Sequence, residues 1–319
     1  MTQPKRLTVE HDIDVAAPAD EVFALIRDVE RWPQLLTSII HVDRHVDPGA
    51  PEGTDTVRLW GVRGHAGVRA RTAHRRVDAD RMRIEFDNEP PPPGARASTG
   101  TWTVVGDASG GCRVYLCHEI DPGDADAATN LRVTTEFGRQ TRLQLDELKR
   151  TAERGKELDQ LILSFEDPLF ISGAVEDAWA ILYEADRWVE RIPHVSRIEM
   201  TEDVPNIQFF DMDTMTPDGR AHTTRSVRVC FPHDLIVYKQ LQLPPLLSAH
   251  TGHWRFVPTP EGIIASARHT VTIKPEALSL LGPDTTVDGA RRYARRVLSA
   301  NSMKNLQIAK AYAEERAHG

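Results

Sequence analysis

The sequence predicts an α+β fold made of two tandem copies of one domain. Each copy is expected to be a curved antiparallel sheet wrapped around a long C-terminal helix, with an internal cavity. Three observations predict it: segments of the first half recur in the second, both halves show the same order of strands and helices, and a length of 319 residues suits two domains. The predicted domains are residues 1–156 and 157–319.

The internal repeat consists of three short segments that recur in the same order. The segment DVERWP from Asp28 matches EADRWV from Glu184, TGTW from Thr99 matches TGHW from Thr251, and HEI from His118 matches HTV from His269. The offsets between partners are 156, 152 and 151 residues. They drift in one direction, as short insertions and deletions in loops would cause, so the repeat indicates duplication of a whole domain.

Hydrophobic periodicity places the elements of the first half. Apolar residues alternate along residues 7–15, which predicts a strand, and Pro18 favours the start of a helix with an apolar stripe. The run Pro90–Pro93 cannot lie within a central strand and predicts a loop at the rim. The predicted elements are a strand (7–15), a short helix from Pro18, a second short helix around Trp32, four to five strands (39–120) and a long helix (130–156).

The second half repeats this order. The charged stretch over about residues 150–160 is compatible with a helix, so we expect the linker to extend the first long helix. The sequence TPDG at residues 216–219 is typical of a hairpin turn. The predicted elements are a strand (161–165), a helix (174–183), further strands (193–273) and a closing helix (286–315).

Composition argues against several functional classes. A net charge of −8 leaves no basic excess to neutralise phosphates, so nucleic acid is not expected as a partner. No apolar run reaches the roughly 18 to 20 residues needed to cross a membrane, and the N-terminus shows no apolar signal segment. Cys112, Cys117 and Cys230 share no metal spacing and cannot all pair, which favours a reduced cytoplasm.

Motifs of covalent, phosphate-binding and metal chemistry are absent from the sequence. It contains no Gly-rich phosphate loop, no G-x-S-x-G, no H-E-x-x-H and no paired C-x-x-C. We therefore expect no metal site and no bound cofactor.

Each half carries one histidine on the apolar face of its last strand. His118 shares its face with Leu116, and His269 shares its face with Val271. Such a histidine is either a core residue satisfied by a hydrogen bond or a group that faces a cavity, and a duplicated core residue would recur equally well. Because the pKa of histidine lies near the working pH, both are candidate catalytic residues.

The preceding strand carries a tryptophan in each half, Trp102 and Trp254. A tryptophan there is either core filler or the wall of an aromatic pocket. The candidate substrate-binding residues are Trp32, Trp60, His74, Trp102, Trp188 and Trp254.

Polar residues alternate along the fourth strand. With an offset of 152, His74 and Arg76 match Ser226 and Arg228. A polar stripe is typical of a solvent face, and parity alone leaves open whether these residues point inward. Burying an arginine in an apolar cavity is costly without a partner, so an inward arginine would serve a ligand carbonyl or enolate. Arg76, Ser226 and Arg228 are therefore candidate catalytic residues.

The segment from Ala17 to Pro33, APADEVFALIRDVERWP, resembles the opening of the Bet v 1/START helix-grip superfamily. Within it, the tandem arrangement is similar to the didomain aromatase/cyclases of bacterial type II polyketide synthases, over essentially the whole chain. The resemblance implies regiospecific first-ring aldol cyclisation of a poly-β-ketone, followed by dehydration to the aromatic. The substrate would be held on the phosphopantetheine arm of an acyl carrier protein, with other synthase components as further partners.

The resemblance also implies residue roles. Ser226-Val227-Arg228 matches a Ser-x-Arg pattern that contacts the chain in single-domain relatives, whereas His74 replaces the serine in the first copy and Arg76 is retained. The arginines would stabilise an oxyanion, the histidines would move protons, and the tryptophans would shape the cavity. We expect two cavities that are not equivalent, the second closer to the family pattern. The alternatives are a START-like carrier of a hydrophobic ligand without catalysis, and a regulatory protein that acts through partner contacts.

Overall fold

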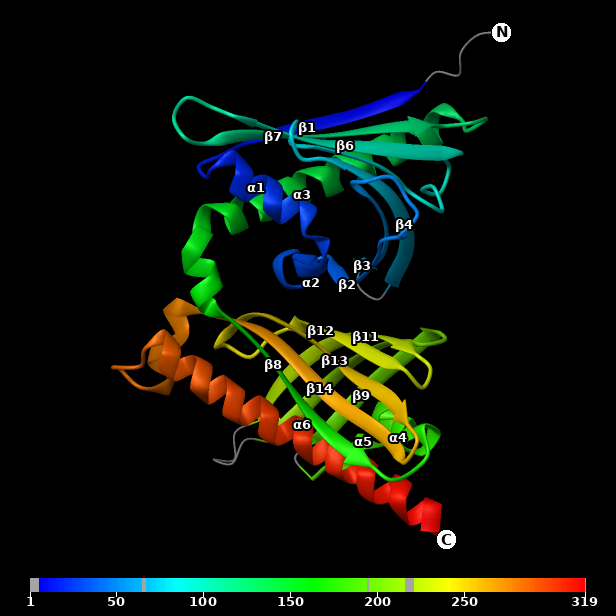
Figure 1. The fold of residues 1–319 in the computed structure, drawn as a ribbon, viewed down its shortest axis with the longest axis vertical. Helices are drawn as coiled ribbons and strands as arrows, with labels where there is room; N and C mark the ends of the chain where they lie inside the picture. Colours follow the sequence, from blue (N-terminus) through cyan, green and yellow to red (C-terminus); the bar gives the residue numbers. More distant parts are fainter. Residues whose placement is uncertain (1–5, 65–66, 194, 216–220, 319) are drawn as a thin grey trace. The chain divides into compact units, whose positions relative to one another are not determined.

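The structure is a computed structural model that describes residues 6–64, 67–193, 195–215 and 221–318. It divides into two compact units, Met1–Lys156 (unit 1) and Glu157–Gly319 (unit 2). Each unit holds a seven-stranded antiparallel sheet and a long C-terminal helix (Figure 1). The predicted α+β class, with two tandem helix-grip domains, is therefore confirmed.

Unit 1 is a meander in which β1 pairs with the last strand, in the order β1-β7-β6-β5-β4-β3-β2. Six strands follow the short helices, where the sequence predicted four to five. The short β5 follows β4 after a turn, so the two run together in the sequence pattern. The strands are β1 (Leu7–Val15), β2 (Ile39–His45), β3 (Thr54–Arg63), β4 (Gly67–Asp78), β5 (Arg83–Asp87), β6 (Ala97–Gly106) and β7 (Cys112–Asp121). The helices are α1 (Ala19–Arg27), the 3₁₀ turn η1 (Val29–Arg31), α2 (Trp32–Leu35) and α3 (Ala127–Leu161).

Unit 2 repeats this topology in the order β8-β14-β13-β12-β11-β10-β9. β8 is longer than predicted, because Asp167 and Pro168 interrupt its apolar pattern; an edge strand tolerates proline. The predicted turn at residues 216–219 lies outside the described residues. The strands are β8 (Ile162–Ile171), β9 (Val195–Val204), β10 (Ile207–Met215), β11 (Ala221–Phe231), β12 (Leu235–Gln242), β13 (Leu247–Thr259) and β14 (Gly262–Ile273). The helices are α4 (Val175–Tyr183), η2 (Ala185–Arg187), α5 (Trp188–Arg191), η3 (Pro275–Leu281) and α6 (Val287–His318).

The linker continues the first long helix, as predicted. α3 runs to Leu161, but Gly155 interrupts it with φ 45° and ψ −130°. A positive φ is costly for residues with a Cβ and costs glycine little. Gly155 therefore lets the helix change direction next to the boundary between the units.

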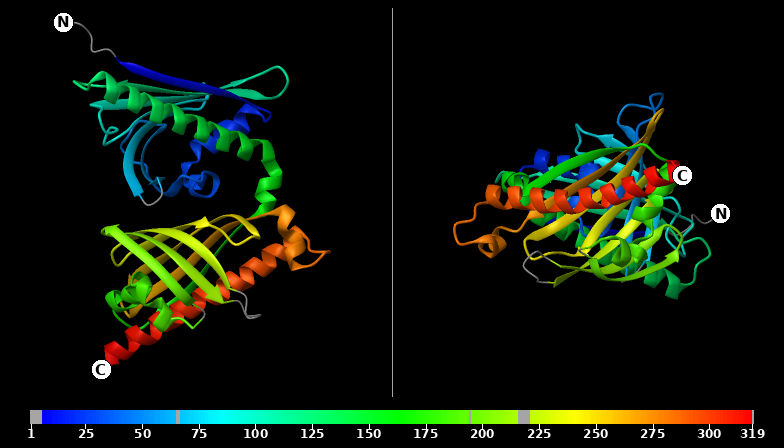
Figure 2. Two further views of the ribbon diagram at one scale, coloured as in Figure 1. Left: turned by 180° about the vertical axis from the view of Figure 1, so that it is seen from behind. Right: turned by 90° about the horizontal axis from the view of Figure 1, so that it is seen from below.

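The long helix of each unit lies along one face of its own sheet, which we call the inner face (Figure 2). In unit 1, Leu145 and Leu148 of α3 share a core cluster with Phe23 of α1 and with Trp102 and Leu116 of the sheet. Unit 2 has a corresponding cluster from α4, α6, β13 and β14. Full burial of one such side chain stabilises the fold by about 1.5–3 kcal/mol. Alternate residues of each strand point to this inner face, so pairing register decides which side chains meet there.

Candidate active site

Two rows of residues cross the inner face of unit 2. In the first row, Tyr238 of β12 lies opposite Gly252 of β13, which lies opposite His269 of β14. In the second row, Ser226 of β11 lies opposite Gln240 of β12. His250 is two residues before Gly252 and so shares its face. The register therefore brings five polar side chains from four strands to one region: Ser226, Tyr238, Gln240, His250 and His269.

Four of these side chains form a continuous chain of polar contacts, which we call the relay. His269 Nδ1 lies 2.7 Å from the Tyr238 hydroxyl and 3.1 Å from His250 Nε2. His250 Nδ1 lies 2.9 Å from Gln240 Oε1. Both histidines are buried. His269 Nε2 is buried and has no hydrogen-bond partner among the described residues.

The polar contacts within the relay determine which ring nitrogen of each histidine carries the proton. With the Gln240 amide oxygen facing His250, Nδ1 of His250 donates to it, and His250 Nε2 is an acceptor. His269 Nδ1 can then donate to His250 Nε2 or to the Tyr238 oxygen. In this tautomer the lone pair of His269 lies on Nε2, the nitrogen without a partner. An unpartnered basic nitrogen in a buried site is suited to accept a proton from a ligand.

Burial keeps the relay uncharged. It lowers the pKa of His269 to about 4, an effect that Asp167 opposes and that Arg295 and His253 reinforce. Burial lowers the pKa of His250 well below its usual value, with a further contribution from His269. Burial also raises the pKa of the Tyr238 phenol. At neutral pH the two imidazoles are therefore neutral and Tyr238 keeps its proton.

Gly252 makes room for Tyr238. A Cβ at this position would overlap the Tyr238 phenol and the carbonyl oxygen of Arg268. Unit 1 has the same pairing of a glycine with an aromatic ring, because a Cβ at Gly100 would overlap the ring of Phe86. In both units the glycine lets an aromatic ring approach the backbone of the neighbouring strand, beside the histidine of the last strand.

A charged pair borders the relay. Arg295 of α6 donates to both oxygens of Asp167 of β8, at 2.6 Å each. The Arg295 guanidinium lies 4.1 Å from the centre of the Phe165 ring, and Phe165 lies 5.2 Å from the ring of His269. This pair holds the long helix against the edge strand next to His269.

Unit 1 has the histidine but lacks the relay. Phe86 occupies the position of Tyr238, and Ser98 that of His250. The His118 ring contacts Phe86 and Phe137 edge-on, at 5.9 and 5.0 Å between ring centres. His118 Nδ1 is buried without a partner among the described residues. Burial first, and then the charges of Arg71 and His11, lower its pKa to about 3. The expected non-equivalence of the two units therefore has a structural basis.

The sequence match between Arg76 and Arg228 is wrong by one residue. Arg75, not Arg76, is the buried arginine of β4: it donates to both oxygens of Asp55, at 2.8 and 2.7 Å, and to Arg27 O at 3.2 Å. Arg76 is exposed. The offset between β4 and β11 is thus 153, one more than the 152 taken from the tryptophan strands, and a slip of one residue reverses the face of a strand.

Arg228 points inward, as its strand parity allowed, but its donors are already engaged. Nε donates to Gln208 Oε1 at 2.9 Å, Nη1 to Leu182 O at 2.7 Å and Nη2 to Tyr183 O at 2.6 Å. The side chain is 1% exposed. Arg228 therefore joins β11 to the C-terminal carbonyls of α4, where a cation is favourable. The expectation of a free cation for a ligand oxyanion is corrected here.

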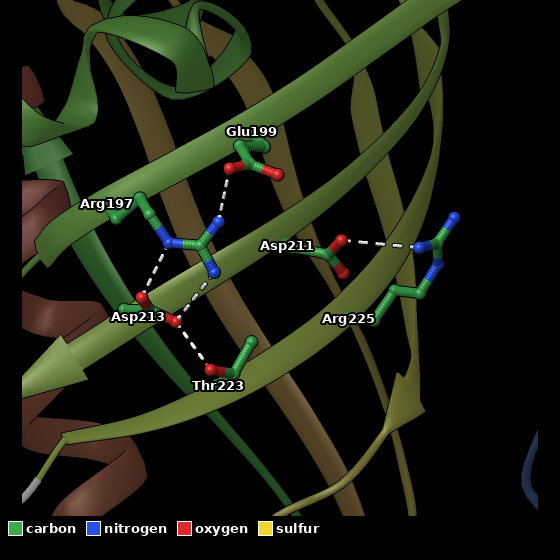
Figure 3. A network of polar contacts seen from close by, with 6 residues as sticks. All are labelled: Arg197, Glu199, Asp211, Asp213, Thr223 and Arg225. Carbon is green, nitrogen blue, oxygen red and sulfur yellow. Dashed lines mark hydrogen bonds and ion pairs between the residues drawn. The ribbon is translucent and has the colours of Figure 1, made fainter.

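The side chains of β11 that alternate with Ser226 and Arg228 lie on the outer face of unit 2. There Arg197 contacts Glu199 and donates to Asp213 at 2.7 Å, Thr223 donates to Asp213 at 2.6 Å, and Arg225 pairs with Asp211 at 3.3 Å (Figure 3). Partly exposed pairs of this kind contribute about 0–1 kcal/mol each. They link β9, β10 and β11 and leave Ser226 and Arg228 on the inner face.

His74 and Trp60 also lie on the outer face, which corrects the expectation that they line an internal cavity. His74 Nδ1 lies 2.9 Å from Asp87 Oδ1. The Trp60 ring contacts His41 at 5.1 Å and the Arg58 guanidinium at 4.8 Å. A hollow of about 650 Å³ on this side of unit 1 is lined mainly by outward side chains, His74 and Arg76 among them.

The four other candidate tryptophans, Trp32, Trp102, Trp188 and Trp254, are buried parts of the two cores. Trp32 Nε1 donates to Leu25 O at 3.1 Å, and Trp188 Nε1 donates to Ile181 O at 2.9 Å. Trp102 and Trp254 belong to the core clusters. A cavity of about 10 Å³ lies beside Trp32 and Trp102, which is room for about one water. Contact of these tryptophans with a substrate stays a prediction.

Sequence reasoning missed Tyr238, Gln240 and His250. One signal could have found His250, because it shares the parity of Trp254, which was already assigned to the apolar face. Tyr238 and Gln240 could be placed beside the histidines only once the pairing of β12 with β13 was known.

Among the described residues there is no cluster that could hold a metal ion and no helix long and apolar enough to cross a membrane.

Comparisons with known proteins agree with this architecture. Residues 6–153 and residues 171–300 each match a family model described as polyketide cyclase / dehydrase and lipid transport. The chain is 38% identical to a granaticin polyketide synthase bifunctional cyclase/dehydratase of Streptomyces violaceoruber, over 97% of this chain and 94% of that protein. It is 36% identical to the actinorhodin counterpart of Streptomyces coelicolor, over 98% and 99%.

Two crystal structures are similar over the whole chain. The di-domain ARO/CYC StfQ from the steffimycin pathway shares 50% identity with a TM-score of 0.86, covering 98% of this chain and 100% of that chain. The di-domain ARO/CYC BexL from the BE-7585A pathway shares 36% identity with a TM-score of 0.85, covering 97% and 99%. This chain therefore belongs to the polyketide cyclase/dehydrase family, as a di-domain aromatase/cyclase.

Proposed function

We propose that this chain is a bifunctional polyketide cyclase/dehydratase that closes and aromatises the first ring of a carrier-bound poly-β-ketone, with the relay of unit 2 moving the protons. The names of the full-length relatives support the reaction class. The observation that carries the residue assignment is His269 Nε2, a buried nitrogen without a partner at the end of a chain of polar groups.

Ring closure needs a base and then an acid. His269 Nε2 takes a proton from a methylene carbon between two carbonyl groups, and the C–H electron pair becomes an enolate. The enolate carbon attacks the carbon of a second carbonyl group and forms the C–C bond. The oxygen of that carbonyl group becomes an alkoxide and takes the proton from the imidazolium. Because the pKa of His269 is about 4, the imidazolium is a strong proton donor, and the histidine ends in its starting state.

Dehydration uses His269 again, first as a base and then as an acid. His269 removes a proton from the carbon next to the new alcohol, a C=C bond forms, and the hydroxyl leaves as water with the proton of the imidazolium. Asp167 opposes the effect of burial on His269, so it stabilises the imidazolium while it exists. Tyr238 and His250 hold the ring in one orientation and one tautomer, which keeps Nε2 directed at the substrate.

The carrier protein is proposed as the partner that delivers the chain. The last helix supplies a basic surface, since Arg292 and Arg296 are exposed. Arg291 donates to Gln160 O at 2.9 Å, and Arg295 is engaged by Asp167. Exposed arginines on one helix would steer an acidic face of a carrier protein toward unit 2.

Product analysis tests this function. The chain is added to a reconstituted synthase that builds the poly-β-ketone, and aromatic and uncyclised products are quantified for the wild type, His269→Gln and His45→Gln. His45 is an exposed histidine of β2 and serves as the matched control. We expect His269→Gln to lose most of the aromatic product and His45→Gln to retain it. Normal aromatic yield from His269→Gln would remove the residue from the mechanism, and a wild-type chain that binds the polyketide without changing the products would indicate a carrier.

A further inference from the structure

The solvent side of α3 carries a row of exposed residues, which we call the basic stripe. The opposite side of the helix packs on the inner face of unit 1 (Figure 2). Between Leu131 and Arg150, every exposed side chain except that of Gln140 falls within about one third of the helix circumference. At 1.5 Å per residue the stripe is about 28 Å long. Its residues are Leu131, Arg132, Thr135, Arg139, Arg142, Leu143, Asp146 and Arg150.

Charge sets the basic stripe apart from the chain as a whole, whose net charge is −8. Arg139 pairs with Glu136 of the same helix at 2.8 Å. Arg142 and Arg150 make no hydrogen bond and no ion pair among the described residues. Asp146 lies one turn from each of these two arginines. Four arginines against this one aspartate leave an excess of positive charge on a helix of an acidic protein.

Two exposed leucines flank the arginines of the stripe. Leu131 is 68% exposed and Leu143 is 49% exposed. They lie at opposite edges of the stripe, about 120° apart around the helix. Arginine is enriched at protein interfaces, and a leucine that a partner covers adds apolar burial. The stripe therefore fits a partner that has acidic groups along its centre and apolar groups at its edges.

The long helix of unit 2 has the charge of this stripe without its leucines. Arg292, Arg296 and Lys304 of α6 are exposed. None of the leucines of α6 is exposed, and its exposed Tyr293 is covered by the Arg296 guanidinium, which lies 5.7 Å from the ring centre. Of the two long helices, α3 therefore offers the surface that combines positive charge with free apolar area.

We propose that the basic stripe of α3 is a docking face for the acyl carrier protein. Its arginines would contact an acidic amphipathic helix of the carrier protein, and Leu131 and Leu143 would pack on the apolar residues of that helix. Such a helix complements the stripe in charge and in shape. The inference rests on the proposed function for the identity of the partner. It gives unit 1 a carrier contact of its own, separate from the arginines of α6.

Titration calorimetry of the full chain with apo carrier protein tests the stripe. The apo form lacks the phosphopantetheine arm, so its binding does not involve the interior of either unit. At 0.15 M salt, charges more than about 8 Å apart are largely screened. We expect the double variant Arg142→Glu/Arg150→Glu to weaken binding by roughly tenfold. Leu131→Ser/Leu143→Ser should weaken it by roughly fivefold.

Arg81→Glu/Arg83→Glu is the matched control. It changes two exposed arginines at the start of β5. Each substitution of arginine by glutamate subtracts two charges, so the control and the arginine variant of α3 share a net charge of −12. The control should bind apo carrier protein as the wild type does. Equal weakening by the two arginine variants would show that overall charge alone governs binding, and would overturn the proposal.

Three other results would also overturn the docking face. They are no binding of apo carrier protein by the wild type at millimolar concentration, wild-type affinity in both α3 variants, and unfolding of both variants, whose side chains are exposed. Self-association of the wild type that the α3 variants lose, measured by sedimentation without carrier protein, would assign the stripe to a second copy instead. A wild-type chain that binds apo carrier protein through α3 but leaves the polyketide products unchanged would support the docking face and contradict the proposed function.

Discussion

Replacing Arg228 by methionine should destabilise unit 2, because the guanidinium joins β11 to the end of α4. The change leaves two buried acceptors unpaired, Gln208 Oε1 and Leu182 O, and it removes one of the two donors to Tyr183 O, which keeps Gln208 Nε2 at 3.3 Å. Each unpaired buried acceptor costs about 1–3 kcal/mol. Removing a charge that is 1% exposed returns part of its desolvation penalty. We therefore expect the free energy of unfolding to fall by about 2–4 kcal/mol.

Urea unfolding of the full chain, followed by circular dichroism, measures this loss. Arg75→Met should give a comparable loss in unit 1, because it removes a buried guanidinium that donates to both oxygens of the buried Asp55 and to Arg27 O. Arg58→Met at the surface should leave the midpoint unchanged. A wild-type midpoint for Arg228→Met, together with lost product formation, would refute the structural role and make Arg228 a catalytic residue.

Three further predictions concern the histidines and their neighbours. Gly252→Ala should reduce aromatic product by roughly a hundredfold, because the new methyl group displaces Tyr238; normal yield would contradict this packing. Asp167→Asn removes a carboxylate that raises the pKa of His269, so the acid limb of the rate profile should move to lower pH. Since the pKa of His118 falls to about 3 from 6.5, the unfolded chain binds more protons between these values, and stability should fall as pH drops from 6.5 to 3. His118→Phe should flatten this dependence of the urea midpoint on pH.

The fold could be predicted from the sequence because its signals are repeated and local. Alternation along residues 7–15, the helix after Pro18 and the two closing helices each appear as an unbroken pattern, and the second copy confirms the first. The strand count was underestimated where β5 follows β4 closely. The length of β8 was underestimated because Asp167, which pairs with Arg295, interrupts the apolar pattern of the strand.

The site could be predicted only in part, because it depends on pairing between strands. The inward position of His118 and His269 was predicted correctly, since each shares a face with apolar neighbours on its own strand, and their catalytic role stays a prediction. The match of Arg76 with Arg228 was wrong because the offset between β4 and β11 is one residue larger than the offset between the two tryptophan strands, from which the match was taken. Tyr238 and His250 meet His269 only through the register of β12, β13 and β14, which a single sequence does not contain.

A double-mutant cycle on product formation tests most directly whether His269 and Tyr238 act as one proton-transfer unit. Initial rates of aromatic product are compared for the wild type, His269→Gln, Tyr238→Phe and the double variant in the reconstituted synthase. Groups that act together lose most of their effect when the first is removed. We expect the double variant to be no slower than His269→Gln alone. Losses that multiply, or a wild-type rate for His269→Gln, would contradict the relay.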